Sequence, residues 1–399
     1  MSADISDLAQ PASSRIVLVV IDGLGGFADA VRGTELEEAR TPNLDLLAAE
    51  GATGLLDPVG PGITPGSGPG HLALFGYDPM SFELGRGALS AAGLEVVLKE
   101  GDVAARGNLA TLNSDGLVVD RRAGRIEDEE ARKVVLVLSE RLELEDVEIQ
   151  LAHEAQHRVL VVLRGPGLDP HVSDTDPQKI GAPPLVPEAQ QPAAERTAGI
   201  VAELDRQVRE ILAGETRANA LLLRGFDTHR VLPTMQSRHQ INPAAVAVYP
   251  MYRGIARLVG MDVLPKPAGL GEQVGLLRAH WNEFDYFFVH HKPADSAGED
   301  GNFDAKVAAI EALDAAIPGI VDLRPDVLAV TGDHSTPSQM AAHSWHPVPA
   351  VVWSPRVGRD DADRFGERWC RQGGLGYRRT VELMPILLAC AGRLAKYGA

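Results

Sequence analysis

One short segment of the sequence carries side chains that could bind a metal ion. The largely apolar run of residues 326–330 predicts a buried strand, and Asp333 and His334 stand just beyond its carboxyl end. In α/β proteins, ligands bind at the carboxyl ends of parallel strands. A carboxylate beside an imidazole at such a place, with His343 on the next loop, indicates half of a site for a divalent cation. The alternative is a turn that ends the strand, with a capping aspartate and a surface histidine.

Two more segments offer oxygen ligands just after an apolar run. Residues 16–21 are all apolar and predict a central parallel strand that ends at Asp22. Residues 286–290 predict another strand, and Asp295 and Glu299 follow it. These two carboxylates can bind the same metal ion if the segment begins a helix. A solvated acidic loop is the alternative for that pair.

A loop rich in glycine and proline presents a serine. Residues 58–70 contain five glycines and four prolines, and they lead directly into the apolar residues 71–75. A linker is the alternative, but a turn that lifts Ser67 toward the next segment resembles the presentation of a nucleophile. If the strand ends gather at one sheet edge, seven donors are enough for two divalent ions, which lower the pKa of a serine hydroxyl and clamp phosphoryl oxygens. The seven are Asp22, Ser67, Asp295, Glu299, Asp333, His334 and His343.

The elements that must position these residues predict an α/β fold. Strand-like and helical patterns alternate in the last part of the chain, which is typical of a doubly wound, mostly parallel sheet. Thr41 and Pro42 predict the start of a further helix, with Thr41 as its N-cap. The pattern of apolar, helical and turn-forming residues changes in the middle of the chain, which indicates an inserted α+β domain. We expect residues 1–99 and 221–399 to form one domain and residues 100–220 to form the insert.

Composition and charge narrow the classes of partner. The chain has 399 residues, of which 45% are hydrophobic and 23% charged, as in ordinary globular enzymes. Its net charge of −17 disfavours nucleic acids and membrane surfaces, but it is compatible with a small phosphorylated substrate held by local arginines and metal ions. No stretch approaches the roughly 18–20 apolar residues that span a bilayer. With two cysteines, no disulfide framework and no apolar signal core, we expect a cytoplasmic protein.

The motifs, taken in order, carry a family resemblance. They are Ile21-Asp22-Gly23, Thr41-Pro42-Asn43-Leu44-Asp45, Asp295-x-x-x-Glu299, and Asp333-His334 with His343 before Pro347-Val348-Pro349. Supporting stretches include Gly85-Arg86-Gly87, Gly107-Asn108-Leu109-Ala110-Thr111 and Val172-Ser173-Asp174-Thr175-Asp176-Pro177. The chain resembles the alkaline phosphatase superfamily and, more narrowly, the cofactor-independent (2,3-bisphosphoglycerate-independent) phosphoglycerate mutases of the archaeal type.

The resemblance implies an alkaline-phosphatase-like core with two metal ions. Ser67 matches the nucleophile that becomes a phosphoserine. The resemblance assigns Asp22, Ser67, Asp333 and His334 to one ion, and Asp295, Glu299 and His343 to the other. The family usually has a histidine where Glu299 stands, and this oxygen donor favours Mg²⁺ or Mn²⁺ over zinc. The family also often has an acidic residue where Gly68 stands, and His346 competes with His343 as a ligand.

The resemblance also implies a reaction and a substrate site. The reaction is the interconversion of 3-phosphoglycerate and 2-phosphoglycerate in glycolysis and gluconeogenesis, with the insert acting as a lid. Arginines suit both the carboxylate and the phosphate of such a substrate. Candidates for substrate contact are His157, Arg158, Arg164, Asp174, Asp176, Arg224 and Lys292, with Arg121 and Arg122 beside them.

Two other functions remain open from the sequence. One is a metal-dependent phosphatase or phosphonate hydrolase on the same core, and the other is a non-catalytic metal or nucleotide sensor. Exposed arginines often only interact with solvent, so the alternative for each arginine above is a surface position without substrate contact. The sequence leaves open whether the chain forms a homo-oligomer.

Overall fold

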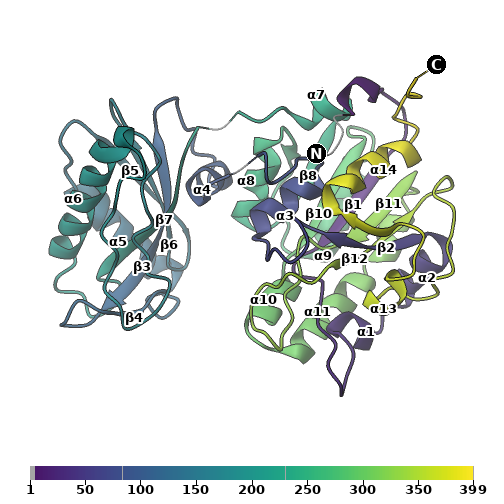
Figure 1. The fold of residues 1–399 in the computed structure, drawn as a ribbon, viewed down its shortest axis with the longest axis horizontal. Coiled ribbons are helices and arrows are strands. Elements are labelled where there is room, and N and C mark those ends of the chain that lie inside the picture. The colour runs from purple at the N-terminus through teal and green to yellow at the C-terminus, as the bar shows by residue number, and fades with distance from the viewer. Residues whose placement is uncertain (1–4, 83, 230, 399) are drawn as a thin grey trace. The chain divides into compact units, whose positions relative to one another are not determined.

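The chain folds into two compact units. The structure, a computed structural model, describes residues 5–82, 84–229 and 231–398 (Figure 1). The first unit comprises Met1–Glu83 and Leu232–Ala399, and the second comprises Leu84–Val231. The second unit is longer at both ends than the expected insert of residues 100–220. The reason is that helix α4 (Arg86–Gly93) packs on its sheet and strand β7 (Ala220–Thr228) pairs with β3 (Val103–Leu112).

The first unit is built on a mostly parallel sheet. Among the described residues it has eight strands in the order β13-β2-β12-β11-β1-β10-β8-β9. All neighbouring pairs in that order are parallel except those of β12, which is antiparallel to β11 and β2. The predicted sheet type is therefore confirmed. The strands are β1 (Ile16–Ile21), β2 (Ala52–Asp57), β8 (Pro243–Val246), β9 (Asp262–Val263), β10 (Tyr286–His291), β11 (Val327–Thr331), β12 (Val348–Trp353) and β13 (Gly376–Arg379).

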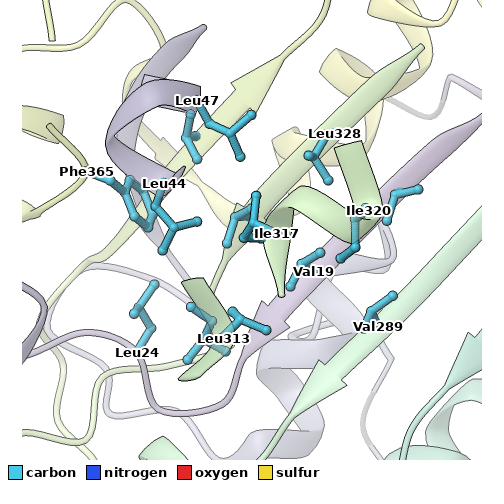
Figure 2. Packing of buried hydrophobic residues seen from close by; sticks show 14 of the residues in the cluster. Val19, Leu24, Leu44, Leu47, Val289, Leu313, Ile317, Ile320, Leu328 and Phe365 are labelled. Carbon is cyan, nitrogen blue, oxygen red and sulfur yellow. The ribbon is translucent and has the colours of Figure 1, made fainter. Parts of the chain in front are cut away.

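Apolar side chains cover both faces of this sheet, which explains the unbroken apolar sequence of β1. On one face, Val19 belongs to a large cluster that also contains Leu313 and Ile317 (Figure 2). On the other face, Phe288 meets the ring of Phe75 edge-on, with the centroids 5.0 Å apart. A central strand buried on both sides has no exposed position for a polar residue.

The helices of the first unit lie on this doubly wound sheet. None of the described helices of the chain is both long enough and apolar enough to cross a membrane. The helices of the first unit are α1 (Glu35–Glu38), α2 (Pro42–Glu50), α3 (Ser67–Leu74), α7 (Met235–His239), α8 (Pro250–Leu258), α9 (Leu270–Ala279), α10 (Pro293–Glu299), α11 (Phe303–Asp314), α12 (Ile317–Val321), α13 (Glu367–Cys370) and α14 (Leu383–Cys390), with short 3₁₀ turns η1 (Ser6–Leu8) and η3 (Thr380–Glu382).

The start of α2 differs from the sequence expectation in one detail. Thr41 occupies the N-cap position, but its side chain accepts no capping hydrogen bond. Asp314, at the end of α11, accepts instead from the backbone N–H groups of Asn43 and Leu44 at 3.0 and 2.8 Å. A carboxylate from a distant helix thus satisfies the free donors of the first turn.

The second unit is an antiparallel α+β structure. Among the described residues its sheet has five strands, and β3 pairs with β4, β6 and β7. One face packs against α5 and α6, and the other packs against α4, so that residues alternate between two apolar clusters along β6. The remaining elements are β4 (Val118–Asp120), β5 (Glu148–Ala155), β6 (Arg158–Arg164), α5 (Asp128–Arg141), η2 (Pro192–Ala194) and α6 (Glu195–Ile211).

The packing of β10 predicts a large loss of stability on truncation. Phe287 is fully buried, and its ring stacks on Trp281 with the centroids 5.3 Å apart. Phe287→Ala should lower the free energy of unfolding by about 3–5 kcal/mol, because it removes a large apolar side chain and leaves a cavity. Leu46→Ala on α2, where the side chain is 57% exposed, should change it by less than about 0.5 kcal/mol. Urea unfolding followed by tryptophan fluorescence measures both, and equal effects would contradict the packing.

Candidate active site

The potential metal ligands follow strands that lie side by side. β1 is the middle of three parallel strands, with β11 on one side and β10 on the other. Asp22 follows β1, Asp333 and His334 follow β11, and Asp295 lies in α10 just beyond β10. β12 runs in the opposite direction, so His343, which precedes it, comes to the same edge. These distant residues meet because parallel strands end together.

A first group of potential ligands contains Asp22, Asp333 and His334. One ligand atom of each lies within 4.8 Å of the other two. His334 Nε2 is 3.3 Å from Asp22 Oδ1 and 3.2 Å from Asp333 Oδ2. Ser67 Oγ is 3.2 Å from the same nitrogen. The three ligand side chains are fully buried and Ser67 is half-buried, so the serine hydroxyl belongs to this group while it stays accessible.

A second group contains Asp295, His343 and, again, His334. His343 Nε2 is 3.6 Å from Asp295 Oδ1, and the rings of His343 and His334 stack with centroids 3.7 Å apart. The carboxylate of Glu299 lies 3.9 Å from His343 Nε2, and its side chain is 47% exposed, so it stands at the rim of the group. His346 is absent from both groups among the described residues, and its Nδ1 lies 2.9 Å from Ser344 Oγ.

Buried negative charge dominates the first group. Burial alone would raise the pKa of Asp22, but Lys292, His290 and His334 outweigh it and hold this pKa well below its usual value. Burial alone would lower the pKa of His334, but Asp333 and Asp22 outweigh it and raise this pKa to about 9. Within the described residues, neither carboxylate oxygen of Asp22 accepts a hydrogen bond with good geometry. Ionised carboxylate oxygens without a well-aligned hydrogen-bond donor, next to imidazoles, fit a divalent cation.

Lys292 lies between the two groups. Its ammonium group contacts Asp295 Oδ2 and lies 3.1 Å from Asp22 Oδ2. Burial alone would lower the pKa of Lys292, but these two carboxylates outweigh it and raise this pKa above its usual value. The sequence predicts Lys292 as a substrate contact, whereas the structure engages it with two potential metal ligands.

The glycine-rich loop presents Ser67 as the first residue of α3. Gly70 allows this helix to lie against the end of β11, because a Cβ atom at Gly70 would stand only 2.2 Å from the backbone oxygen of Asp333. His71, one turn beyond Ser67, directs Nδ1 to the Ser67 carbonyl at 2.8 Å and to Asp333 Oδ2 at 3.2 Å. His71 is a residue that the sequence reasoning missed, although its spacing from the serine pointed to it.

The second unit gathers arginines on one face of its sheet. Arg106 of β3 stands directly opposite Arg224 of β7, and Arg158 of β6 stands opposite Asn108, two residues further along β3. Residues two apart on a strand and directly opposite one another share a face. Like charges in this arrangement repel each other, and neighbouring carboxylates or a bound anion offset that repulsion.

Arg86 and His157 lie close enough to these arginines to interact with them electrostatically. We call the five residues Arg86, Arg106, Arg158, Arg224 and His157 the arginine cluster. Desolvation by the surrounding protein, together with Arg106 and Arg224, lowers the pKa of Arg86 to about 10. Burial and the charges of Arg158 and other arginines lower the pKa of His157 to about 3. Arg86 and Arg106 were missed as site residues. Arg86 was visible only as part of a family motif, and nothing in the sequence reveals that Arg106 and Arg224 pair.

Carboxylates form ion pairs with Arg224 of the arginine cluster and with the nearby Arg121. Asp176 is fully buried and forms a two-pronged ion pair with Arg121, at 2.9 and 2.6 Å. Arg224 lies 3.7 Å from both Asp174 and Asp176, and Asp174 also accepts from the backbone N–H of Gly225.

Arg164 lies apart from the cluster, contrary to its expected place in the substrate site. It stands at the other end of β6 from Arg158, and its Nε donates to Asp102 at 3.0 Å. Strands rise about 3.3 Å per residue, so the two ends of β6 are too far apart for one small ligand. We therefore do not expect Arg164 to contact the same substrate as Arg158.

The fold and the site define a class: α/β proteins that gather carboxylate and imidazole ligands, with a serine, at the carboxyl edge of a mostly parallel sheet. The family model described as 2,3-bisphosphoglycerate-independent phosphoglycerate mutase matches residues 48–217. A curated protein of Thermus thermophilus, named probable 2,3-bisphosphoglycerate-independent phosphoglycerate mutase, is 53% identical over 99% of this chain and 98% of its own length. The chain belongs to this family of phosphoglycerate mutases.

Solved structures agree with that assignment. The cofactor-independent phosphoglycerate mutase of Thermoplasma acidophilum superposes with a TM-score of 0.69 at 30% identity, over 95% of this chain and 100% of that one. The PH0037 protein of Pyrococcus horikoshii superposes with a TM-score of 0.81 at 31% identity, over 98% of this chain and 100% of that one.

The environment of His157 predicts a pH dependence. The pKa of His157 is about 3 in the folded chain and near its ordinary value of about 6.5 in the unfolded chain, so between these values only the unfolded state binds the proton. The contribution of His157 to the free energy of unfolding should therefore fall as the pH drops below about 6.5. The His157 ring should show no NMR titration between pH 8 and pH 5. His157→Gln should flatten the decline of stability over that range, and a ring titration near pH 6.5 would contradict the burial.

Proposed function

We propose that this chain interconverts 3-phosphoglycerate and 2-phosphoglycerate and that Ser67 carries the phosphoryl group between the two positions. The observation that carries the proposal is the placement of the accessible Ser67 hydroxyl 3.2 Å from His334 Nε2, inside a group with two buried carboxylates. Family membership supports the substrate, since the relatives are named for this reaction. A cytoplasmic location stays a prediction.

The proposed ligands fall into the two groups described above. Asp22, Asp333 and His334 would hold one cation together with Ser67, while Asp295 and His343 of the second group, with Glu299 at its rim, would hold another. Oxygen-rich sets of this kind suit Mg²⁺ or Mn²⁺. When bound, such ions lower the pKa of a serine hydroxyl and neutralise phosphoryl oxygens.

In the proposed reaction, the Ser67 oxygen gives up its proton and forms a bond to the substrate phosphorus, while the bond from phosphorus to the glycerate oxygen breaks and that oxygen gains a proton. The freed glycerate then turns, its other hydroxyl gives up a proton and takes the phosphoryl group, and the Ser67 oxygen is protonated again. His71, through its contacts with the Ser67 carbonyl and Asp333, holds α3 in register with the first group. Lys292, with its ammonium group 3.1 Å from Asp22 Oδ2, would supply positive charge beside the first group during phosphoryl transfer.

The arginine cluster of the second unit is the proposed place for the substrate carboxylate and for the glycerate during its turn. Arginine donates two parallel hydrogen bonds to a carboxylate or a phosphate, which fixes its orientation. With a pKa of about 3, His157 is neutral and a weak base, so we assign it a hydrogen bond to a glycerate hydroxyl rather than a proton transfer. An anion in the cluster would offset the arginine charges and raise this pKa.

A metal-dependent phosphatase is the alternative to test. A mutase must keep the dephosphorylated glycerate bound, whereas a hydrolase releases it and admits water. The second unit (Leu84–Val231) would act as the lid that retains glycerate, and its arginines would donate paired hydrogen bonds to an anionic ligand.

Replacement of the nucleophile tests the proposed chemistry. Ser67→Ala should reduce 2-phosphoglycerate formation by at least about a thousandfold, because a covalent step loses its attacking atom. It should also abolish the phosphoserine that mass spectrometry detects after substrate is added to the wild-type protein. An enolase-coupled assay follows mutase flux, and a free-phosphate assay runs in parallel. Chelation should stop the wild-type enzyme, and Mn²⁺ or Mg²⁺ should restore it.

The two assays separate the outcomes. Mutase flux that survives in Ser67→Ala would mean that the nucleophile is misassigned. Release of free phosphate by the wild-type enzyme as its main product would replace the mutase with a phosphatase.

The arginine cluster predicts an effect on substrate binding. Arg106→Gln should raise KM for 3-phosphoglycerate by at least about tenfold, because a charged hydrogen bond to an anion contributes about 1.5–3 kcal/mol. Arg206→Gln is the matched control, since Arg206 lies on α6 and pairs with Glu203 and Glu210 on the exposed surface. Steady-state kinetics should show no change in KM for the control. An unchanged KM in Arg106→Gln would remove this residue from the substrate site.

A further inference from the structure

Thr336 joins the two groups of metal ligands through a single hydroxyl. Its Oγ1 donates to Asp295 Oδ1 at 2.8 Å and lies 3.0 Å from His334 Nδ1. Asp295 belongs to the second group and His334 to both groups. Thr336 is fully buried, so its hydroxyl reaches these two residues and not solvent.

The hydroxyl has one proton, and this determines its partners. A carboxylate can only accept, so the Thr336 proton goes to Asp295. The lone pairs of Oγ1 then accept the N–H of His334 Nδ1. His334 Nδ1 therefore keeps its proton, and Nε2, which faces Ser67 and Asp22, is the nitrogen left to act as a ligand.

The backbone of Thr336 is held as firmly as its side chain. Its N–H donates to the carbonyl of Gly25 at 3.1 Å, and its carbonyl accepts from the ammonium group of Lys306 at 2.9 Å. Lys306, fully buried on α11, also donates to the Gly25 carbonyl at 2.9 Å and lies 3.7 Å from Glu35. One ammonium group thus connects the loop after Asp22 with the loop after His334.

The space around this contact is closed. Gly23, which follows Asp22, has φ +68°, and a Cβ atom there would lie 2.7 Å from Thr336 Oγ1 and 2.8 Å from Asp295 Cβ. The loops of β1, β10 and β11 therefore meet at the Thr336 side chain with no room to shift.

We propose that Thr336 is a positioning residue that sets the ligand nitrogen of His334 and the rotamer of Asp295 together, so that the two cation sites form as one unit. The proposal rests on the metal centre of the proposed function. It predicts that loss of the hydroxyl weakens both cation sites at once, although Thr336 contacts neither ion.

The test compares three variants in metal binding. Thr336→Val keeps the shape of the side chain and removes the hydroxyl, and Thr336→Ser keeps the hydroxyl. Thr53→Val is the matched control, since Thr53 is buried on β2 and its hydroxyl donates to the carboxylate of Asp360 at 3.1 Å, away from the metal ligands. Mn²⁺ titration of each metal-free protein, followed by electron paramagnetic resonance, gives the number and affinity of bound ions without turnover. Thermal unfolding without metal shows whether each variant folds.

Thr336→Val should weaken both Mn²⁺ sites by about 10–100-fold, the usual effect of removing a hydrogen bond that orients a ligand. It should lower kcat with little change in KM. Thr336→Ser should recover both properties to within a few-fold, and Thr53→Val should match the wild-type protein. Wild-type affinity at both sites in a folded Thr336→Val, or a loss confined to one site, would overturn the proposal. Failure of the wild-type protein to bind Mn²⁺ would overturn the proposed metal centre instead, so the two failures are distinguishable.

Discussion

Repulsion among buried carboxylates is the constraint on which this structure depends. Asp22, Asp295 and Asp333 are all at most 1% exposed, and two of them lie within hydrogen-bond distance of the same imidazole ring. Burying even one ionised carboxylate without a partner is costly, and burying several together costs more. The protein places Lys292 and several histidines around them, which keeps the pKa values of Asp22 and Asp333 below their usual range. Three ionised carboxylates this close together, with only one lysine and several imidazoles around them, suit divalent cations, and the rest of the first unit serves to hold them in place.

The sheet provides that rigidity. The carboxylates follow three neighbouring parallel strands, β1, β10 and β11, which are buried on both faces. These strands cannot separate without exposing the core. The loops beyond the strands are then joined to one another by polar contacts in addition to the apolar packing of Leu24 and Ala294. Lys306 connects two of them through backbone carbonyls, and Thr336 adds the third through Asp295. Buried polar networks of this kind specify one arrangement when every member is satisfied.

Much of the first unit follows from its sequence, and the reason is physical. A short apolar run rich in β-branched residues, such as residues 16–21, predicts a covered strand, and a carboxylate directly after it lies at the ligand-binding edge. Long-range pairing is what the sequence does not reveal. Arg106 and Arg224 become neighbours only through the register of β3 and β7, and α2 takes its cap from Asp314 rather than from Thr41. Arg164 looked equivalent to Arg158, but an even spacing of six residues along one strand puts the two on the same face at opposite ends.

The first unit concentrates negative charge and the second concentrates positive charge, and the proposed cations and anionic substrate would neutralise them. The first unit brings buried carboxylates together around Lys292 and several histidines, and the second places arginines opposite one another, with Asp174 and Asp176 beside Arg224. A phosphorylated carboxylic acid is repelled by the first cluster when no cation is bound and is attracted by the second. Under the proposed function, cation binding therefore comes before the phosphoryl group reaches Ser67. A chain with a net charge of −17 can act on an anionic substrate when bound cations and local arginines supply positive charge, as the proposal requires.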